Sequence, residues 1–174
     1  MTSILIVPGY LNAGPGHWQS LWEDALPDCS RVPMPSWDRP VRAQWVEALD
    51  EAIAAAQGPP LLVGHGLGCL AIVHWAADHE RAVRGALLAA PVDVERADIG
   101  EPQRSFGPIP RGTLPFPAIL AASSDDPWMG LQRARELARE WEADFVDLGP
   151  CGRLDWGSGH GPWVRGEALL SELR

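Results

Sequence analysis

The stretch Leu61-Leu62-Val63-Gly64-His65-Gly66-Leu67-Gly68-Cys69 decides how this chain folds, because a short apolar run passes through three glycines into a longer apolar segment. The run at 61–63 is typical of a buried strand. The segment 67–77 predicts a helix that begins after only three intervening residues. We therefore expect a strand, a tight turn and a helix, with Gly66 at the centre of the turn.

The glycine spacing matches the strand-to-helix turn G-x-S-x-G, the nucleophile elbow, with Gly66 in place of serine. Such a turn needs small residues two positions before and after its centre, because strand and helix nearly collide there. Gly64 and Gly68 meet that need. The central residue has a strained backbone, so replacing serine by glycine relieves roughly 1–3 kcal/mol. The stretch thus predicts an elbow without its nucleophile.

A phosphate-binding or dinucleotide-binding loop is the main alternative, since glycine-rich turns that open helices bind phosphates through backbone amides. The motif G-x-G-x-x-G would need glycine at position 69, where Cys69 stands. That motif also belongs to the first strand-helix unit, and no G-K-[ST] follows the turn. The spacing favours the elbow, with an ordinary structural turn as the remaining alternative.

Strand and helix patterns alternate along the rest of the chain. We expect strands at 4–7, 61–63, 85–90, 118–122 and 144–148, and helices at 18–26, 41–57, 67–77, 131–141 and 163–173. Such alternation predicts an α/β fold, a mostly parallel sheet with helices on both faces in a Rossmann-like three-layer sandwich. The length of 174 residues fits one domain, 1–174. The segment 92–117, rich in Pro, Gly and Arg, is a lid or rim of a pocket, or a loose connector.

Composition excludes several classes of function. The formal net charge is −9 and the 14 basic residues, all arginines, are scattered, so nucleic acid is not an expected partner. No run of about twenty apolar residues is present, and the first seven residues lack a signal-peptide pattern, so we expect a cytoplasmic protein that does not bind membranes. Three widely spaced cysteines suggest reduced thiols, and we expect neither a metal nor a cofactor.

Beyond the elbow, four further motifs resemble one family, the small α/β-hydrolases related to retinoblastoma-binding protein 9 and its bacterial relatives. They are Val7-Pro8-Gly9-Tyr10, Gly14-Pro15-Gly16-His17-Trp18-Gln19, Ser123-Ser124-Asp125-Asp126-Pro127-Trp128 and Ser158-Gly159-His160-Gly161-Pro162-Trp163. The resemblance covers nearly the whole chain and implies an α/β-hydrolase fold with a pocket at the elbow.

In that family serine, aspartate and histidine form a catalytic triad. The resemblance places the nucleophile position at Gly66 and the aspartate at Asp126, with Asp125 as the weaker candidate. The family's histidine stands in a Gly-His-Ile-Asn-like motif, which corresponds here to 152–155, so Arg153 occupies the base position. A guanidinium stays protonated above about pH 12 and cannot act as a general base. We expect Arg153 to lie within about 4 Å of Asp126 as an ion pair.

Other side chains could replace the missing groups. His160 follows the last strand and is the candidate substitute base, although a loop or capping role fits it as well. Cys151 is a weaker candidate nucleophile, and Cys69 is expected to be buried and inert. His65 and His17 are expected to hold the turn or line the pocket through structural hydrogen bonds.

The backbone donors that stabilise an oxyanion in this fold do not depend on side-chain identity. They are the N–H of Leu67 and one N–H after the first strand, from Tyr10 or Leu11. Together with Arg153 they favour a carboxylate or a phosphate, unless Asp126 already neutralises the arginine. Trp128 is expected to line the same pocket.

Our leading hypothesis is a non-catalytic member of a serine-hydrolase family that binds a small molecule, such as a carboxylate or an ester, or a protein. The alternative is an active hydrolase of small esters or amides that uses His160 as base, with water or Cys151 as nucleophile. A glycine introduced at 66 to trap a substrate is a third hypothesis, which Arg153 disfavours because a single engineered change would leave the histidine in place.

Overall fold

Six short stretches of the chain form one parallel sheet in the computed structural model, which describes residues 1–174. The strands are β1 (Ile4–Val7), β2 (Cys29–Arg31), β3 (Leu61–His65), β4 (Gly85–Ala89), β5 (Ala118–Ala122) and β6 (Asp144–Asp147). Their order across the sheet is β2-β1-β3-β4-β5-β6. All residues of β1, β3, β4 and β5 are buried, as expected for parallel strands covered on both faces.

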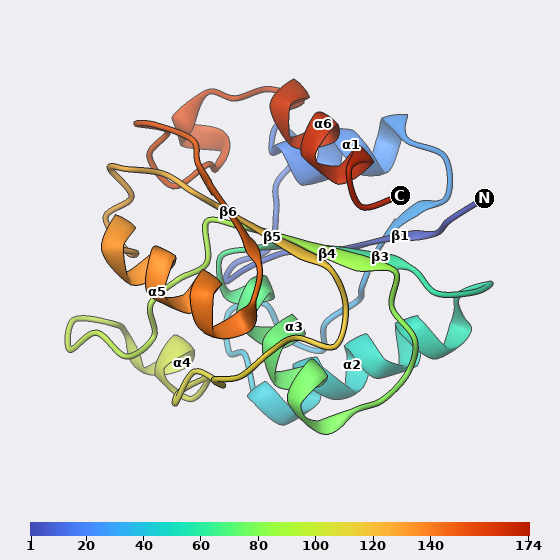
Figure 1. Cartoon of the computed structure of the whole chain (residues 1–174), viewed down its shortest axis with the longest axis horizontal. Helices are drawn as coiled ribbons and strands as arrows, with labels where there is room; N and C mark the ends of the chain where they lie inside the picture. Colours follow the sequence, from blue (N-terminus) through green and yellow to red (C-terminus); the bar gives the residue numbers. More distant parts are fainter.

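Helices cover both faces of this sheet (Figure 1). One face carries α1 (Trp18–Ala25) and α6 (Val164–Ser171), and the other carries α2 (Arg42–Ala55), α3 (Leu67–Asp78) and α5 (Leu131–Trp141). Each face has its own buried apolar cluster. The expected three-layer α/β architecture is confirmed. No helix combines the length and apolar character needed to cross a membrane.

The expected elements are all present, and three short ones were not expected. They are β2, the single-turn helix α4 (Glu101–Arg104) and the 3-10 turn η1 (Trp156–Ser158). The bounds of β5 and α5 are those predicted, whereas β3 extends two residues beyond the expected strand, to His65. The final helix is shorter than the expected 163–173.

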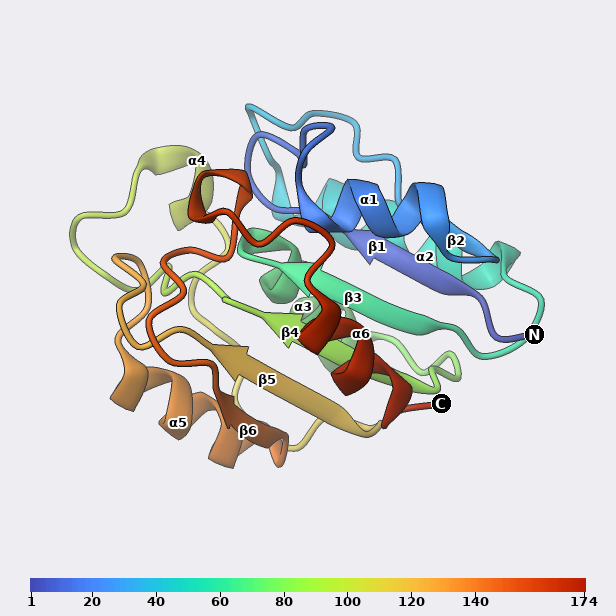
Figure 2. The same ribbon diagram turned by 90° about the horizontal axis from the view of Figure 1, so that it is seen from above.

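The strand order places the elbow at the topological switch point of the sheet, where successive strands change from being added on one side of β1 to being added on the other. From β1 the chain continues to β2 on one side, and then crosses to β3 on the other. Ligands bind in open α/β sheets at such a switch point, outside the carboxyl ends of the strands. The strand arrows in Figure 2 point to this edge, where the loops after β1 and β3 begin.

The segment 92–117 packs against the α2–α3 side of the molecule. Its buried apolar residues are Val92, Val94, Ile99, Phe106, Ile109, Leu114 and Phe116. The His74 Nε2 lies 2.5 Å from the Phe106 carbonyl oxygen, and Arg42 donates to the Gly107 carbonyl oxygen at 3.2 Å. These contacts make a loose connector the wrong description of the segment.

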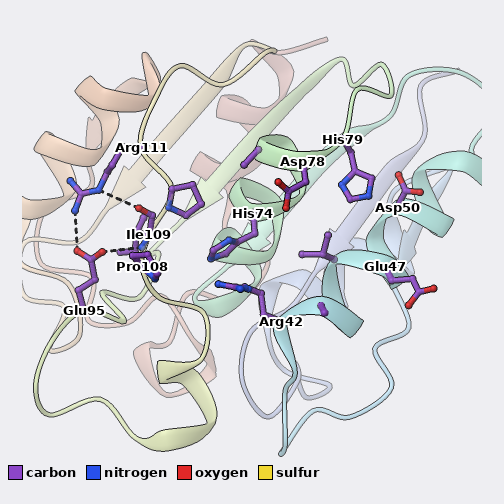
Figure 3. A pocket seen from close by; sticks show the side chains of 14 residues that line it. Arg42, Glu47, Asp50, His74, Asp78, His79, Glu95, Pro108, Ile109 and Arg111 are labelled. Atoms are coloured by element: carbon purple, nitrogen blue, oxygen red, sulfur yellow. Dashed lines mark hydrogen bonds and ion pairs between the residues drawn. The ribbon is translucent and has the colours of Figure 1, made fainter.

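This segment, α2 and α3 enclose a groove of about 1080 Å³, into which Arg42 and His74 project (Figure 3). No elbow residue lines the groove. A role of 92–117 as a lid or rim over the elbow stays a prediction.

Candidate functional site

Gly66 has the backbone conformation of an elbow centre, with φ 55° and ψ −122°. A Cβ on Gly68 would lie 1.9 Å from the Val7 carbonyl oxygen, and a Cβ on Gly64 would lie 2.9 Å from Ile72 Cδ1. The two flanking glycines are therefore required by the close approach of strand and helix. A Cβ on Gly66 would instead meet nothing within 4 Å, so the centre of the turn faces open space.

Two backbone N–H groups are free at this space. Leu67 opens α3 and has no acceptor within its helix. The Tyr10 N–H makes no hydrogen bond, whereas the Leu11 N–H donates to the Trp37 carbonyl oxygen at 2.9 Å. A Cβ on Gly9 would lie 3.2 Å from the Leu67 nitrogen, so the loop after β1 is close to the start of α3. Of the two expected second donors, Leu11 has its N–H bonded to Trp37, and the role of Tyr10 stays a prediction.

The adjacent aspartates have different tasks. Asp125 is exposed and accepts hydrogen bonds from the Gly152 N–H (2.7 Å) and the Ser123 hydroxyl (2.8 Å). The Gly152 bond is the main reason that the pKa of Asp125 is lowered. Asp126 is half-buried, and this burial raises its pKa to about 6, although the Trp128 N–H at 2.9 Å opposes the shift. Asp125 thus ties two loops together, while Asp126 is the aspartate whose pKa is raised by burial.

The expected ion pair between Arg153 and Asp126 is absent, so that prediction was wrong. Arg153 belongs to none of the chain's ion pairs. Its guanidinium carbon lies 5.7 Å from the centroid of the Trp128 ring, within the range of a cation–π contact. The Asp126 Oδ1 meanwhile faces the Trp128 backbone N–H. Trp128 therefore provides a partner for each side chain, its ring for Arg153 and its backbone N–H for Asp126, while the charge of Arg153 still acts on Asp126 and opposes the rise in its pKa.

His65 fixes the loop that carries Arg153. Its Nε2 lies 2.8 Å from the Arg153 carbonyl oxygen, and burial lowers the pKa of His65 to about 4. The centroid of the His17 ring lies 4.7 Å from that of His65. His17 is the N-cap of α1, and its Nδ1 accepts the Gln19 N–H at 3.1 Å. Burial lowers the pKa of His17 to about 3. Both imidazoles are therefore neutral near pH 7 and serve as structural groups beside the elbow.

The candidate replacement groups contact backbone carbonyls instead of Asp126. The His160 Nε2 lies 3.0 Å from the Cys151 carbonyl oxygen. The Cys151 thiol donates to the Leu148 carbonyl oxygen, and burial raises its pKa. Cys69 is fully buried and its thiol pKa is raised by burial. None of the three has the arrangement of an activated base or nucleophile.

Two polar residues near the site carried no signal in the sequence. Asp155 caps the turn η1 by accepting from Ser158 N–H (3.1 Å) and hydroxyl (3.0 Å), and it contributes negative charge near Asp126. Arg31 of β2 reaches the loop after β1. Arg31 stands in a short polar stretch, which gives no indication of its bonds to Asn12 and Ala13. These bonds form only because the fold places β2 beside the loop after β1.

Comparison with known structures gives the same fold. A YdeN-like hydrolase from Pectobacterium atrosepticum is 30% identical with a TM-score of 0.89, over 99% of this chain and 90% of that chain. The ydeN gene product of B. subtilis is 18% identical with a TM-score of 0.77, over 98% of each chain. Est1E from Butyrivibrio proteoclasticus is 11% identical with a TM-score of 0.75, over 99% of this chain and 88% of that chain. The last two similarities show the fold alone, and no curated protein sequence matches the chain.

A family model described as Serine hydrolase matches residues 4–172, which is almost the entire chain. The fold, the elbow conformation of Gly66 and the free amides beside it agree with that match. The chain therefore belongs to the serine hydrolase family and has an α/β-hydrolase fold.

Proposed function

We propose that this chain binds a small carboxylate at the elbow and does not hydrolyse esters. In this proposal Gly66, Asp126 and Arg153 occupy the three triad positions of the branch related to retinoblastoma-binding protein 9. The nucleophile and the base are thereby lost, while the backbone donors of the oxyanion hole remain.

The observation that carries the proposal is the open space at Gly66 beside two free amides. A serine side chain would fill part of this space, and its absence leaves room for a ligand atom next to the Leu67 and Tyr10 N–H groups. Leu67 is also the first residue of a 12-residue helix. The partial positive charge at a helix N-terminus favours an anion there.

Charges around the site support a singly charged carboxylate over a phosphate. Arg153 has no carboxylate partner in the chain and can supply two parallel N–H donors to a ligand. Asp155 is near enough to Asp126 to raise the pKa of that carboxyl, and two negative charges near the site would repel a dianion more strongly than a monoanion. The raised pKa of Asp126, to about 6, reduces this repulsion as the pH falls.

Loss of hydrolysis is supported by the chemistry of the replaced groups. Glycine has no hydroxyl to acylate, and a guanidinium keeps its proton throughout the physiological range. The alternative, a hydrolase with His160 as base, would need an aspartate to orient the imidazole. The contact of His160 with the Cys151 carbonyl does not favour that role.

Binding is tested by calorimetric and amide-NMR titration with acetate, hexanoate, benzoate and ferulate; ferulic acid is the molecule bound to Est1E. The titration should shift the amide signals of Tyr10 and Leu67. Leu67→Pro removes one donor at the first helical position, where proline is tolerated, and should weaken binding about tenfold or more. Leu67→Ala keeps the N–H and loses more packing than Leu67→Pro does, so it is the control for an effect of packing on binding.

Catalysis is tested separately with a fluorophosphonate probe and p-nitrophenyl esters of several chain lengths. We expect no covalent labelling and no turnover above that of heat-treated protein. Labelling, or esterase activity that survives repurification, would contradict a purely binding role and favour the hydrolase alternative.

A further inference from the structure

We infer that Arg31 is a positioning residue for the elbow site: from the edge strand β2 it holds the loop 9–13 so that the Tyr10 N–H is presented to a bound anion. The inference rests on the proposed function, because it concerns the second donor of the same site. It assigns a role to a side chain on a different strand from the elbow.

The Arg31 guanidinium uses all three of its nitrogens. Nη1 donates to the Asn12 side-chain oxygen and to the Ala13 carbonyl oxygen, each at 2.8 Å. Nη2 donates to the Ser20 hydroxyl at 2.7 Å, and Nε donates to Glu23 at 3.3 Å. The side chain is only 19% exposed. These four bonds join β2, the loop and α1 through one rigid planar group.

The loop needs such support because its backbone is strained. Leu11 and Asn12 have φ values of 68° and 66°, in the left-handed region that side chains other than glycine rarely adopt. Strained residues persist only where surrounding contacts hold them. Arg31 contacts the second of these residues and the one after it, while Leu11 is held by the Trp37 carbonyl.

Tyr10 lies between the two anchored parts of this segment. On one side Gly9 packs against the elbow, where an added Cβ would lie only 2.9 Å from the His65 carbonyl oxygen and 3.2 Å from the Leu67 nitrogen. On the other side Asn12 and Ala13 are fixed by Arg31, and the Asn12 side-chain oxygen also accepts the Ala13 N–H at 2.8 Å. If Arg31 is removed, its bonds to Asn12 and Ala13 are lost, and only the Leu11, Asn12 and Ser20 hydrogen bonds remain to hold this side of the loop. The Tyr10 N–H should then be held less firmly beside the start of α3.

The competing explanation is that Arg31 contributes to stability alone. A variant of Glu23 distinguishes this explanation from a positioning role. Glu23→Gln removes the charge partner of Arg31 and leaves its three bonds to the loop and Ser20 in place. Arg31→Met removes all four bonds and keeps an unbranched apolar side chain in place of the arginine stem. Arg31→Lys keeps the positive charge but cannot make the planar set of bonds.

The test measures benzoate affinity by calorimetry, thermal stability, and hydrogen exchange of the Leu11 amide in the full chain. Arg31→Met should lose roughly ten- to a hundredfold in benzoate affinity, the effect of one charge-assisted hydrogen bond. Arg31→Lys should recover only a small part of that loss. Glu23→Gln should bind benzoate as the original protein does. Exchange of the Leu11 N–H should become at least about tenfold faster in Arg31→Met, nearly as fast in Arg31→Lys, and unchanged in Glu23→Gln.

Each result decides the inference. Equal benzoate affinity in Arg31→Met and the original protein overturns it. If the original protein binds no carboxylate, the proposed function fails, and hydrogen exchange of the Leu11 N–H alone decides the role of Arg31. Unchanged exchange in Arg31→Met then overturns that role, whereas faster exchange supports it. Should Arg31→Met not fold, Asn12→Gly removes one acceptor of Arg31 without adding strain, and the same measurements apply.

Discussion

At the scale of single residues, Gly66 combines an elbow backbone with the absence of any side chain. Its φ of 55° and ψ of −122° would strain any other residue, at a cost of roughly 1–3 kcal/mol. Nothing lies within 4 Å of a Cβ at this position, so a side chain added there meets no steric obstacle. The position can therefore be tested by restoring the group that the family's elbow carries.

Activity should return only when two residues are restored together, because nucleophile and base act as one unit. Gly66→Ser alone lacks a proton acceptor, and Arg153→His alone lacks a nucleophile, so each should be inert toward p-nitrophenyl acetate. If position 153 is the base position, as proposed, the double variant combines a hydroxyl, an imidazole, Asp126 and the free amides, and should show measurable turnover.

The single variants are the controls for this experiment. If Gly66→Ser alone equals the double variant, Arg153 does not occupy the base position and His160 becomes the better candidate. If the double variant folds but stays silent, the catalytic arrangement has been lost beyond these two positions.

Asp126 should make stability depend on pH in a direction set by its raised pKa. Its folded pKa of about 6 lies above the value of 3.8 for an unperturbed carboxyl, so its contribution is fully present below pH 3.8 and is lost as the pH rises through 6. Asp126→Asn removes this loss and keeps an acceptor for the Trp128 N–H. The variant should be more stable by about 1–2 kcal/mol at pH 7.5, after allowance for solvent screening.

Urea unfolding across the pH range checks this expectation. The difference between Asp126→Asn and the original protein should vanish near pH 4 and reach its maximum above pH 6. A difference that is constant with pH would show that packing, not ionisation of Asp126, causes the effect.

At the scale of elements, the strand, turn and helix around the elbow fit together only with glycine at two positions. Gly68→Ala would place a Cβ 1.9 Å from the Val7 carbonyl oxygen, so α3 must move away from β1. We expect a loss of more than about 3 kcal/mol in the free energy of unfolding, because both elements are buried. Gly66→Ala meets no neighbour and should cost only the strain of roughly 1–3 kcal/mol. Urea unfolding of the two variants measures the contrast, and equal losses would contradict it.

The sequence predicts elements well where apolar patterns are long, as in α5 and β5, whose bounds agree with the structure. It does not predict β2, since three residues with two polar side chains carry no strand pattern. The elbow is predictable because Gly64 and Gly68 are required by the close approach of strand and helix, which depends on residues near in sequence. The partner of Arg153 is not predictable from the sequence, because Trp128 and Asp126 have similar sequence separations from Arg153. Only the folded loops determine which of the two its guanidinium contacts.

At the scale of the whole molecule, the segment 92–117 extends the apolar core on the α2–α3 side of the sheet. Phe106 is fully buried and packs edge-on against Trp45, at 5.4 Å between ring centroids. It also adjoins His74, and Arg42 donates to the next carbonyl. A segment anchored in this way should unfold together with the sheet.

Phe106→Ala should therefore destabilise the entire molecule by about 3–5 kcal/mol, the usual cost of truncating a buried phenylalanine. Ser105→Ala, at an exposed neighbouring position, should change stability by less than about 0.5 kcal/mol and is the control. Urea unfolding followed by circular dichroism should show one cooperative transition at lower urea for Phe106→Ala. If global stability is unchanged while proteolysis cuts within 92–117, the segment unfolds separately from the sheet. Because the elbow lies outside the groove that this segment borders, folded Phe106→Ala should also keep the benzoate affinity of the original protein.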